Sequence, residues 1–514
     1  MRLLPLLAAA LLAMTAVTVP ARAAAPDGTL ALESSAVRAG DPIRLSYSTP
    51  RPHAKNWVGL YTEPGNGPVA EQFVGPSLTW VYTPDAGGTA TLPTQGLEPG
   101  DYVVYFLAQD GYAWLAQPAR LKLVSSAALH FVTSPFTLRN GRAGTPYGAS
   151  VTGLVKGDTS GLTFTKKAGA AWIAVAADGR VSGTPTAAGT SALTVEARNA
   201  AGQTSTASVS IRVRGASETL VPRLKAMSWN LWHGGSQVSG GREKQLRFLL
   251  DRDVDVVGLQ ETSSTSAQEL AQALGWDHYQ AGADLGIISR YPITARGPLP
   301  SQSGLAGIYA RVRLDERTGR ELVLWNAHLG YTPYGPYDAC FSNRTTQQLL
   351  TREANSGRTG QIQAIVQAMG GHLQAAGTHP VLLTGDFNAP SHLDYTAAAA
   401  SSHCGRSGIP WPTSKVPEQA GLKDSYRVAR PNPVTAPGNT WSPVYKTFTG
   451  GYGYDHRAGD PEPQDRIDFV HYAGGLSVES SDAVVAGTPA PHPGHGGNEW
   501  TSDHAAVLTT FTLS

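Results

Sequence analysis

The chain has 514 residues and a net charge of +1. A single hydrophobic core stops growing well short of this length, so two to four domains are expected. The near-zero charge gives no global attraction to polyanions and argues against a protein whose whole surface is built to bind nucleic acid.

The first 25 residues have the pattern of a secretory signal. Arg2 supplies the charged end, an apolar stretch runs from Leu3 to Val19, and small residues around Ala23 provide a cleavage site. The alternative is a membrane anchor, but the apolar run is near the lower length limit for a span and is broken by Pro5. We therefore expect a secreted, extracellular protein without a transmembrane segment.

Two all-β sandwich modules are expected next, over residues 26–125 and 128–214. In the first, short apolar runs alternate with Gly, Pro, Asn and Asp, a spacing typical of a β-sandwich. In the second, the segment from Val181 to Ala197 has a strand–turn–strand pattern and resembles immunoglobulin-like domains of exported bacterial proteins. Neither module holds a cluster of titratable groups, so a spacer or packing role is expected. The alternative is contact with a cell surface or carbohydrate through aromatic side chains, namely Trp57, Trp80, Tyr82 and Trp114.

Strands and helices alternate from residue 222 to 514. The run from Val254 to Leu259 is almost wholly apolar, as in a strand buried on both faces, whereas Gly241–Leu250 and Gly360–Met369 favour helices. This alternation predicts an α/β domain with two sheet layers and covering helices. The domain has 23 Lys and Arg against 26 Asp and Glu, a net charge of −3, which disfavours a nuclease that grips many phosphates.

Only two cysteines occur, Cys340 and Cys404. In an exported protein such a pair is expected to form a disulfide, and the alternative is two buried thiols.

Five predicted strands in the α/β domain have polar side chains at one end. They are Asn230, Glu261, His328, Asp386 with Asn388, and Asp503 with His504. One carboxylate at a strand end is usually a cap or turn former, but five such ends with hard ligands, amides or imidazoles indicate a site. An Asp-His dipeptide can set a metal-binding carboxylate beside a general base, and a further carboxylate, Asp468, can hold the ring of that base. The pattern predicts metal-assisted attack of water on a phosphate ester.

Six short motifs occur in the order found in the endonuclease/exonuclease/phosphatase superfamily, which includes deoxyribonucleases, inositol-polyphosphate phosphatases and neutral sphingomyelinases. The motifs are Met227–Trp232, Gly258–Thr262, Asn326–Leu329, Gly385–Asn388, Asp465–Phe469 and Ser502–His504. Residues 222–514 resemble this family, and the resemblance implies a four-layer α/β sandwich catalytic domain.

The resemblance and the chemistry of the residues together suggest a metal site. Glu261 is expected to be the main ligand, with Asn230 and Asp503 completing the shell. Oxygen ligands favour Mg²⁺ or Mn²⁺.

The same reasoning assigns the catalytic roles. His504 is expected to take the proton of the attacking water, and Asp468 to fix its tautomer. Asp386 should help to place the nucleophile, Asn388 should donate to the phosphoryl oxygens or hold the water, and His328 should contact the phosphate.

Three neighbouring segments are open to two interpretations. Residues 331–337 carry three tyrosines that either wall the cleft or form a folded loop pinned by Cys340. Residues 450–456 are a candidate for a mobile rim of the cleft. Asp465 and Arg466 are interpreted as a surface pair unless Arg466 contacts substrate.

We therefore expect a secreted Mg²⁺-dependent phosphodiesterase acting on a small or lipid-derived substrate. A secreted nuclease is the alternative and requires a local stripe of Lys and Arg. A surface-binding protein with an inactive third domain is the other alternative, and the complete set of eight polar residues argues against it.

Overall fold

The computed structural model describes residues 26–94, 96–125, 127–301 and 304–513. The predicted signal, residues 1–25, lies outside this range. The chain divides into two compact units at residue 126. None of the helices within the described ranges has the length and apolar character needed to cross a membrane.

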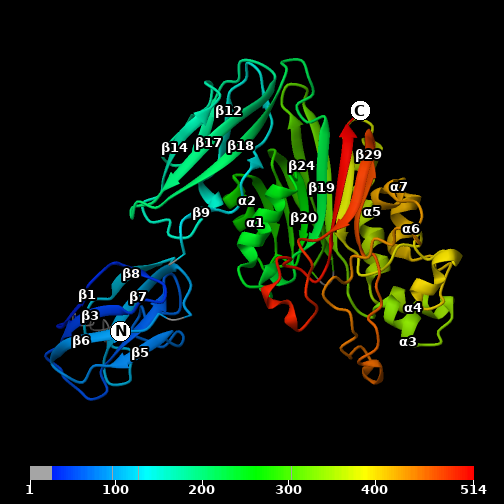
Figure 1. Cartoon of the computed structure of the whole chain (residues 1–514). Helices are drawn as coiled ribbons and strands as arrows, with labels where there is room; N and C mark the ends of the chain where they lie inside the picture. The colour runs from blue at the N-terminus through cyan, green and yellow to red at the C-terminus, as the bar shows by residue number, and fades with distance from the viewer. Residues whose placement is uncertain (1–25, 95, 126, 302–303, 514) are drawn as a thin grey trace, which may run out of the picture. The chain divides into compact units, whose positions relative to one another are not determined.

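The first unit has two sheets that share one core (Figure 1). Its strands are β1 (Thr29–Leu32), β2 (Ala36–Arg38), β3 (Ile43–Ser48), β4 (Trp57–Thr62), β5 (Thr79–Tyr82), β6 (Gly87–Leu92), β7 (Gly100–Leu107) and β8 (Ala119–Val124). One sheet has the order β1-β3-β6 and the other β2-β8-β7-β4-β5. In β3, Ile43, Leu45 and Tyr47 are buried and alternate with less buried residues, as expected for a strand with one face on the core.

The second unit begins with a β module that matches the predicted strand–turn–strand pattern. Its strands are β9 (His130–Phe131), β10 (Phe136–Thr137), β11 (Gly141–Arg142), β12 (Tyr147–Ser150), β13 (Val155–Lys156), β14 (Thr163–Gly169), β15 (Ala174–Val175), β16 (Arg180–Gly183), β17 (Gly189–Arg198) and β18 (Thr204–Arg214). The long strands β17 and β18 pair antiparallel over their whole length and form the centre of the main sheet.

Two six-stranded sheets follow. The strands are β19 (Arg223–Asn230), β20 (Val256–Gln260), β21 (Asp277–Ala281), β22 (Leu285–Ser289), β23 (Ile293–Ser301), β24 (Gly304–Asp315), β25 (Arg320–His328), β26 (Val381–Asp386), β27 (Lys423–Asp424), β28 (Asp468–Ala473), β29 (Leu476–Val484) and β30 (Ala506–Leu513). The sheet orders are β21-β22-β20-β19-β30-β29 and β23-β24-β25-β26-β28-β27.

The two sheets pack face to face through side chains such as Leu224, Val256, Leu324 and Leu382. Gly258 allows this close approach, because a Cβ atom there would lie 2.1 Å from the hydroxyl of Thr384 on the opposite sheet.

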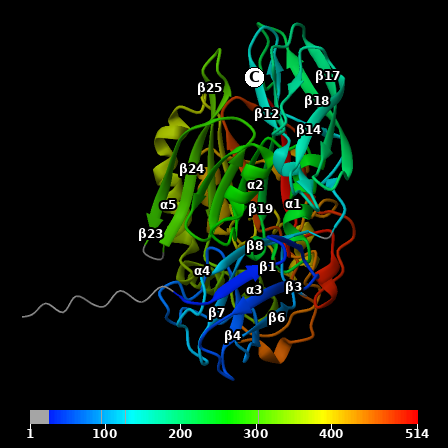
Figure 2. The same ribbon diagram turned by 90° about the vertical axis from the view of Figure 1, so that its left-hand side faces the viewer.

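The helices of this part lie outside the two sheets. They are α1 (Gly241–Asp251), α2 (Ser266–Leu274), α3 (Gly335–Phe341), α4 (Thr346–Asn355), α5 (Arg358–Gln374), α6 (Pro412–Gln419) and α7 (Ser425–Ala429). Helices α1 and α2 pack on the sheet that contains β19 and β20, and α5 packs on the sheet that contains β25 and β26 (Figure 2). The helices predicted at residues 241–250 and 360–369 are confirmed as α1 and α5.

The β module and the α/β part share one hydrophobic core. Phe131 and Leu154 of the module belong to the same buried cluster as Leu249 of α1 and Leu270 of α2. Polar contacts fix the same interface: Arg142 pairs with Asp315 at 2.6 Å, and both side chains are buried. Residues 127–514 therefore form one folded body.

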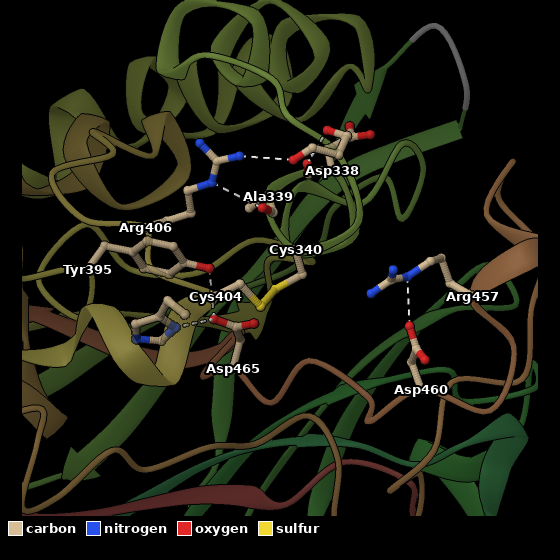
Figure 3. The surroundings of a disulfide bond; sticks show 11 residues. Asp338, Ala339, Cys340, Tyr395, Cys404, Arg406, Arg457, Asp460 and Asp465 are labelled. Atoms are coloured by element: carbon tan, nitrogen blue, oxygen red, sulfur yellow. Dashed lines mark hydrogen bonds and ion pairs between the residues drawn. A yellow bond between two sulfur atoms is a disulfide. The ribbon is translucent and has the colours of Figure 1, made fainter.

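Cys340 and Cys404 form a disulfide, as expected (Figure 3). The bond joins the end of α3 to the segment after residue 403. Arg406 reinforces this link by donating from Nε to the carbonyl of Ala339 at 3.1 Å.

Candidate active site

Strand register brings the predicted residues to one edge of each sheet. In the second six-stranded sheet, His328 lies opposite Asp386 in the parallel pair β25–β26, and Asp386 lies opposite Asp468 in the antiparallel pair β26–β28. In the first, Asn230 at the end of β19 pairs with Gln260, the residue before Glu261. Because the sheets pack face to face, these ends meet in one place.

Asn230 links the two sheets. Its buried amide nitrogen donates to Glu261 Oε1 and to Asp386 Oδ2, each at 3.1 Å. Its Oδ1 accepts from the backbone N–H of Trp232 at 2.9 Å. Asn230 therefore holds the carboxylates of Glu261 and Asp386 towards each other.

His504 lies between two carboxylates. Its Nδ1 is 2.9 Å from Asp468 Oδ2, and its Nε2 is 3.6 Å from Asp386 Oδ2. Asp468 is in turn fixed by its backbone N–H, which donates to the hydroxyl of Thr440 at 3.1 Å. This is the geometry of a base and its orienting carboxylate.

His328 is held by a residue that the sequence reasoning missed. Its Nδ1 lies 3.0 Å from Asp284 Oδ1, and its Nε2 lies 3.4 Å from Asp386 Oδ2. Asp284 also accepts from the backbone N–H of Glu261 at 3.1 Å. Asp284 precedes β22, so the strand-end pattern that identified the other residues also marks this one.

Two site residues have strained backbones. Glu261 has φ 54° and Asn388 has φ 49°, in the left-handed region that non-glycine residues rarely adopt. Such strain persists where surrounding contacts impose it, commonly at functional sites. The backbone N–H of Asn388 donates to Asp386 Oδ1 at 2.8 Å, and its side-chain amide donates to the carbonyl of Leu329 at 3.0 Å.

The charges in the site respond strongly to burial and to each other. Burial opposes protonation of His504, but Asp468 and Asp386 raise its pKa to about 10. Burial would raise the pKa of Asp386, but the charges of His504 and His328 lower it to about 2. Burial and the charge of Glu261 raise the pKa of Asp503 to about 7. The site therefore has more negative charge than its own residues balance.

The residues present fit a divalent cation. Asp503 Oδ1 and Asp468 Oδ1 are buried and accept no hydrogen bond from any residue that the structure describes. Buried carboxylate oxygens of this kind are costly unless a cation or donor approaches them. Glu261 and Asp503 provide carboxylate oxygens, and Asn230 provides its amide Oδ1, which also accepts from the N–H of Trp232; oxygens of these kinds are the preferred ligands of hard cations.

A second grouping also satisfies the geometry of a metal site. Ligand atoms of Asp386, Asp468 and His504 lie within 4.8 Å of one another. This set overlaps the predicted catalytic residues rather than the predicted ligands. Because His504 already directs both ring nitrogens at these two carboxylates, the arrangement also fits a base with its orienter.

A cavity of about 390 Å³ opens above these groups. Its aromatic walls are Tyr331, Tyr334, Tyr337, Trp441 and Tyr452. Its polar lining is His233, Glu261, His328, Asp386, Asn388, Asp503 and His504. No Lys or Arg is among the lining residues in the described part of the chain.

The tyrosine-rich segment after His328 does wall the cavity, but it is not a loop throughout. Gly335 begins α3, which carries Tyr337. Trp441 was missed because it lies in an irregular segment with no periodic pattern; its ring contacts the ring of His504 with centroids 5.1 Å apart.

The expectation of a surface pair at Asp465 and Arg466 was wrong, because both side chains are buried. Asp465 accepts from the hydroxyl of Tyr395 at 3.1 Å (Figure 3). Arg466 pairs with Asp394 at 2.9 Å and Asp424 at 2.7 Å. Arg466 is absent from the cavity lining, so a contact with substrate is not supported.

Comparison with known proteins gives matches for both parts of the second unit. Residues 227–504 match the model of the Endonuclease/Exonuclease/phosphatase family, and residues 130–214 match that of the family described as "Putative Ig domain". An uncharacterized protein of Caenorhabditis elegans is 35% identical over 301 residues, which cover 56% of this chain and 91% of that protein.

Similar solved structures include three named proteins. A truncated TDP2 of C. elegans is 15% identical with a TM-score of 0.37 and covers 57% of this chain and 98% of its own. A 3′ phosphatase from Neisseria bound to a product DNA hairpin is 18% identical with a TM-score of 0.33, covering 56% and 98%. An AP endonuclease from Leishmania major is 15% identical with a TM-score of 0.34, covering 57% and 89%.

Proposed function

The chain belongs to the Endonuclease/Exonuclease/phosphatase family, and from this premise we propose that it is a secreted Mg²⁺-dependent hydrolase of a small or lipid-derived phosphodiester. The catalytic part would be a four-layer α/β sandwich preceded by two β modules. The observation that carries the proposal is the cavity, which joins a cluster of carboxylates and imidazoles to a wall of five aromatic side chains.

The cavity lining favours a compact substrate over a nucleic acid chain. Proteins that grip nucleic acids neutralise several phosphates with Lys and Arg, whereas no such side chain lines the described cavity. Aromatic walls provide apolar area and ring faces for a lipid-derived or ring-bearing group. The imidazoles of His233, His328 and His504 line the cavity and are within reach of one phosphate there.

Glu261, Asn230 and Asp503 would hold Mg²⁺, with Mn²⁺ as an equivalent. When bound, such an ion polarises a phosphoryl oxygen and offsets the charge that develops on it. The excess of buried carboxylate described above supports this assignment.

His504 is the proposed base. Asp468 keeps a proton on Nδ1 and directs Nε2 towards Asp386 and the cavity. To accept a proton from water, Nε2 must be neutral, and this requires the negative charge of Asp386 and Asp503 to be balanced. Asp386 then orients the water, while His328 and Asn388 donate to the phosphoryl oxygens.

Secretion is proposed from two observations. The first 25 residues have the signal pattern, and Cys340 and Cys404 form a disulfide, as is usual in proteins of oxidising compartments. Fractionation of producing cells should place the protein in the medium with its N-terminus near residue 26; retention in the cell pellet would contradict this.

A substrate panel tests the activity. Purified protein should hydrolyse bis(p-nitrophenyl) phosphate or sphingomyelin with Mg²⁺, and EDTA should abolish turnover. The panel should include p-nitrophenyl phosphate, inositol phosphates, RNA and single- and double-stranded DNA. Preferential cleavage of DNA or RNA would replace this proposal with a nuclease, and no turnover of any member would favour an inactive binding protein.

A further inference from the structure

Exposed apolar side chains are concentrated in one short segment of the first unit. Among the described residues, ten large hydrophobic side chains are exposed, and six of them lie between residues 69 and 82. These six are Val69, Phe73, Val74, Leu78, Trp80 and Tyr82, with exposed fractions from 44% to 68%. We call them the 69–82 patch. Clusters of this kind mark sites of interaction in soluble proteins, because exposing them to water is costly.

The segment is held in place rather than loosely attached. Residues 69–78 lie between β4 and β5, and the indole N–H of Trp114 donates to the carbonyl of Pro68 at 2.9 Å. The backbone N–H of Trp114 donates to the carboxylate of Glu71 at 3.0 Å. Asn66 donates to the carbonyl of Pro76 at 2.8 Å. These contacts fix the backbone in a form that points several apolar side chains outwards.

Aromatic rings connect the loop to the edge strand. Centroids are 5.6 Å apart for Phe73 and Tyr112, 6.1 Å for Tyr112 and Trp57, and 6.4 Å for Trp57 and Trp80. Trp80 and Tyr82 follow at 4.9 Å on β5, the outermost strand of its sheet (Figure 1). Phe73 of the loop is therefore linked by a row of ring contacts to Trp80 and Tyr82 of the strand.

The charges indicate an uncharged partner. Between residues 64 and 82 the only charged residue is Glu71, which is engaged by Trp114. Residues 26–125 contain six Lys and Arg against nine Asp and Glu. A negatively charged module gains nothing from an anionic surface, since attraction to anionic lipid or nucleic acid depends on basic residues.

The composition of the 69–82 patch favours a lipid bilayer over a carbohydrate as its partner. Val69, Val74 and Leu78 offer no ring face and no hydrogen-bonding group, the two features that bind carbohydrate, but they partition readily into hydrocarbon. Trp80 and Tyr82 flank them, and the Tyr82 hydroxyl donates to Asp110, which is also paired with Lys55. Trp and Tyr with polar neighbours are typical of the depth of lipid headgroups.

We propose that the 69–82 patch inserts into the surface of a zwitterionic lipid bilayer and attaches the protein peripherally to it. This inference rests on the first unit alone and does not depend on the proposed catalytic chemistry. This proposal replaces the expectation of carbohydrate contact through Trp57, Trp80, Tyr82 and Trp114. Trp57 is buried, and aliphatic residues add to the exposed apolar surface.

Vesicle binding tests the proposal. The purified full-length protein should co-float with phosphatidylcholine vesicles, and its tryptophan emission should shift to the blue. Val69→Ser combined with Val74→Ser should weaken partitioning by about tenfold or more, because two inserted side chains are lost. Raising the salt from about 0.05 to 0.5 M should leave binding unchanged, since screening acts only on charge-driven attraction.

A matched control is available in the second unit. Val428 and Val434 are exposed to 48% and 51%, and Val428→Ser with Val434→Ser should leave vesicle binding unchanged. Far-UV circular dichroism and thermal unfolding of both double variants establish that they are folded. Because Val69 and Val74 are exposed to 68% and 58%, their replacement should not disturb the core.

Three results would overturn the proposal. The first is failure of the wild type to bind phosphatidylcholine vesicles. The second is binding only to vesicles with anionic lipid, lost in high salt. The third is retention on insoluble polysaccharide that Trp80→Ala removes while Val69→Ser with Val74→Ser does not, which would identify a carbohydrate site.

Discussion

Two buried clusters of charged side chains differ in their balance of positive and negative groups. The first contains Arg466 and Arg427 with Asp394 and Asp424, two positive and two negative groups in direct ion pairs. The second contains Glu261, Asp386, Asp468 and Asp503 around His328 and His504, so carboxylates outnumber imidazoles by two. Arg466 and Asp468 are only two residues apart in sequence. Balance of charge indicates a structural network, and an excess of negative charge indicates a cation site.

The two clusters also set opposite states for their histidines. His471, which faces Asp424, Arg466 and His392 in the balanced cluster, has its pKa lowered to about 4, chiefly by burial. His504 in the unbalanced cluster has its pKa raised to about 10 by Asp468 and Asp386, against the effect of burial. Equal burial therefore accompanies opposite shifts in pKa, because only His504 has a surplus of carboxylate around it.

The largest expected effect comes from removing the base of the unbalanced cluster. His504→Ala should lower kcat on the best phosphodiester by about 10³- to 10⁴-fold, because general base catalysis is lost. Thermal unfolding and circular dichroism should show a folded protein. Turnover equal to that of the wild type would remove His504 from the mechanism.

Breaking the balanced cluster should instead cost stability. Arg466→Met leaves Asp394 short of one partner and Asp424 without its cation, and should lower the free energy of unfolding by about 3–5 kcal/mol. Urea unfolding measures the loss. The control is Arg457→Met, because Arg457 forms an exposed pair with Asp460 at 2.6 Å (Figure 3) and should contribute less than about 1 kcal/mol. Similar losses in both variants would contradict the distinction.

His471 in the balanced cluster should make the free energy of unfolding depend on pH. The pKa of His471 is lower in the folded protein than its ordinary value of 6.5, so the unfolded chain binds the proton more tightly. The contribution of His471 is therefore favourable above pH 6.5 and is lost as the pH falls towards 4, by about 3 kcal/mol in total. His471→Phe should remove this part of the dependence in urea unfolding between pH 7 and 4.5. Parallel curves for the two proteins would contradict it.

The cation itself should give the smallest of these effects. Mg²⁺ at a hundredfold excess over its dissociation constant should stabilise the wild type by about 2.7 kcal/mol, seen as a higher Tm, and EDTA should reverse it. Glu261→Gln should lose this response while unfolding normally without metal. Glu269→Gln is the matched control, because Glu269 lies on the surface and pairs with Arg242. An unchanged Mg²⁺ response in Glu261→Gln would rule out Glu261 as a ligand.

The sequence was sufficient to predict the residues at strand ends, because an apolar run followed by a polar side chain is a local pattern. Asn230, Glu261, His328, Asp386 and His504 all come together in the structure. Their proposed roles stay predictions until variants are measured.

Features that depend on tertiary packing were not accessible from local patterns. Trp441 lies in an irregular segment, and its contact with His504 arises only when that segment pairs with Asp465 and His504, which precede β28 and β30. The burial of Arg466 was missed because charged residues are seldom buried unless paired, and its partners are 42 and 72 residues distant in sequence. The strand pattern also gave no indication that the module before residue 215 would share a core with α1 and α2.

That shared core limits how the gene can be divided or recombined. A fragment beginning at residue 222 would contain every residue of the proposed reaction. It would, however, expose to water the apolar faces of α1 and α2 that the module covers. Such a fragment should aggregate and be poorly soluble. Residues 127–514 are therefore expected to be stable when produced as one piece, because the module then covers the apolar faces of α1 and α2.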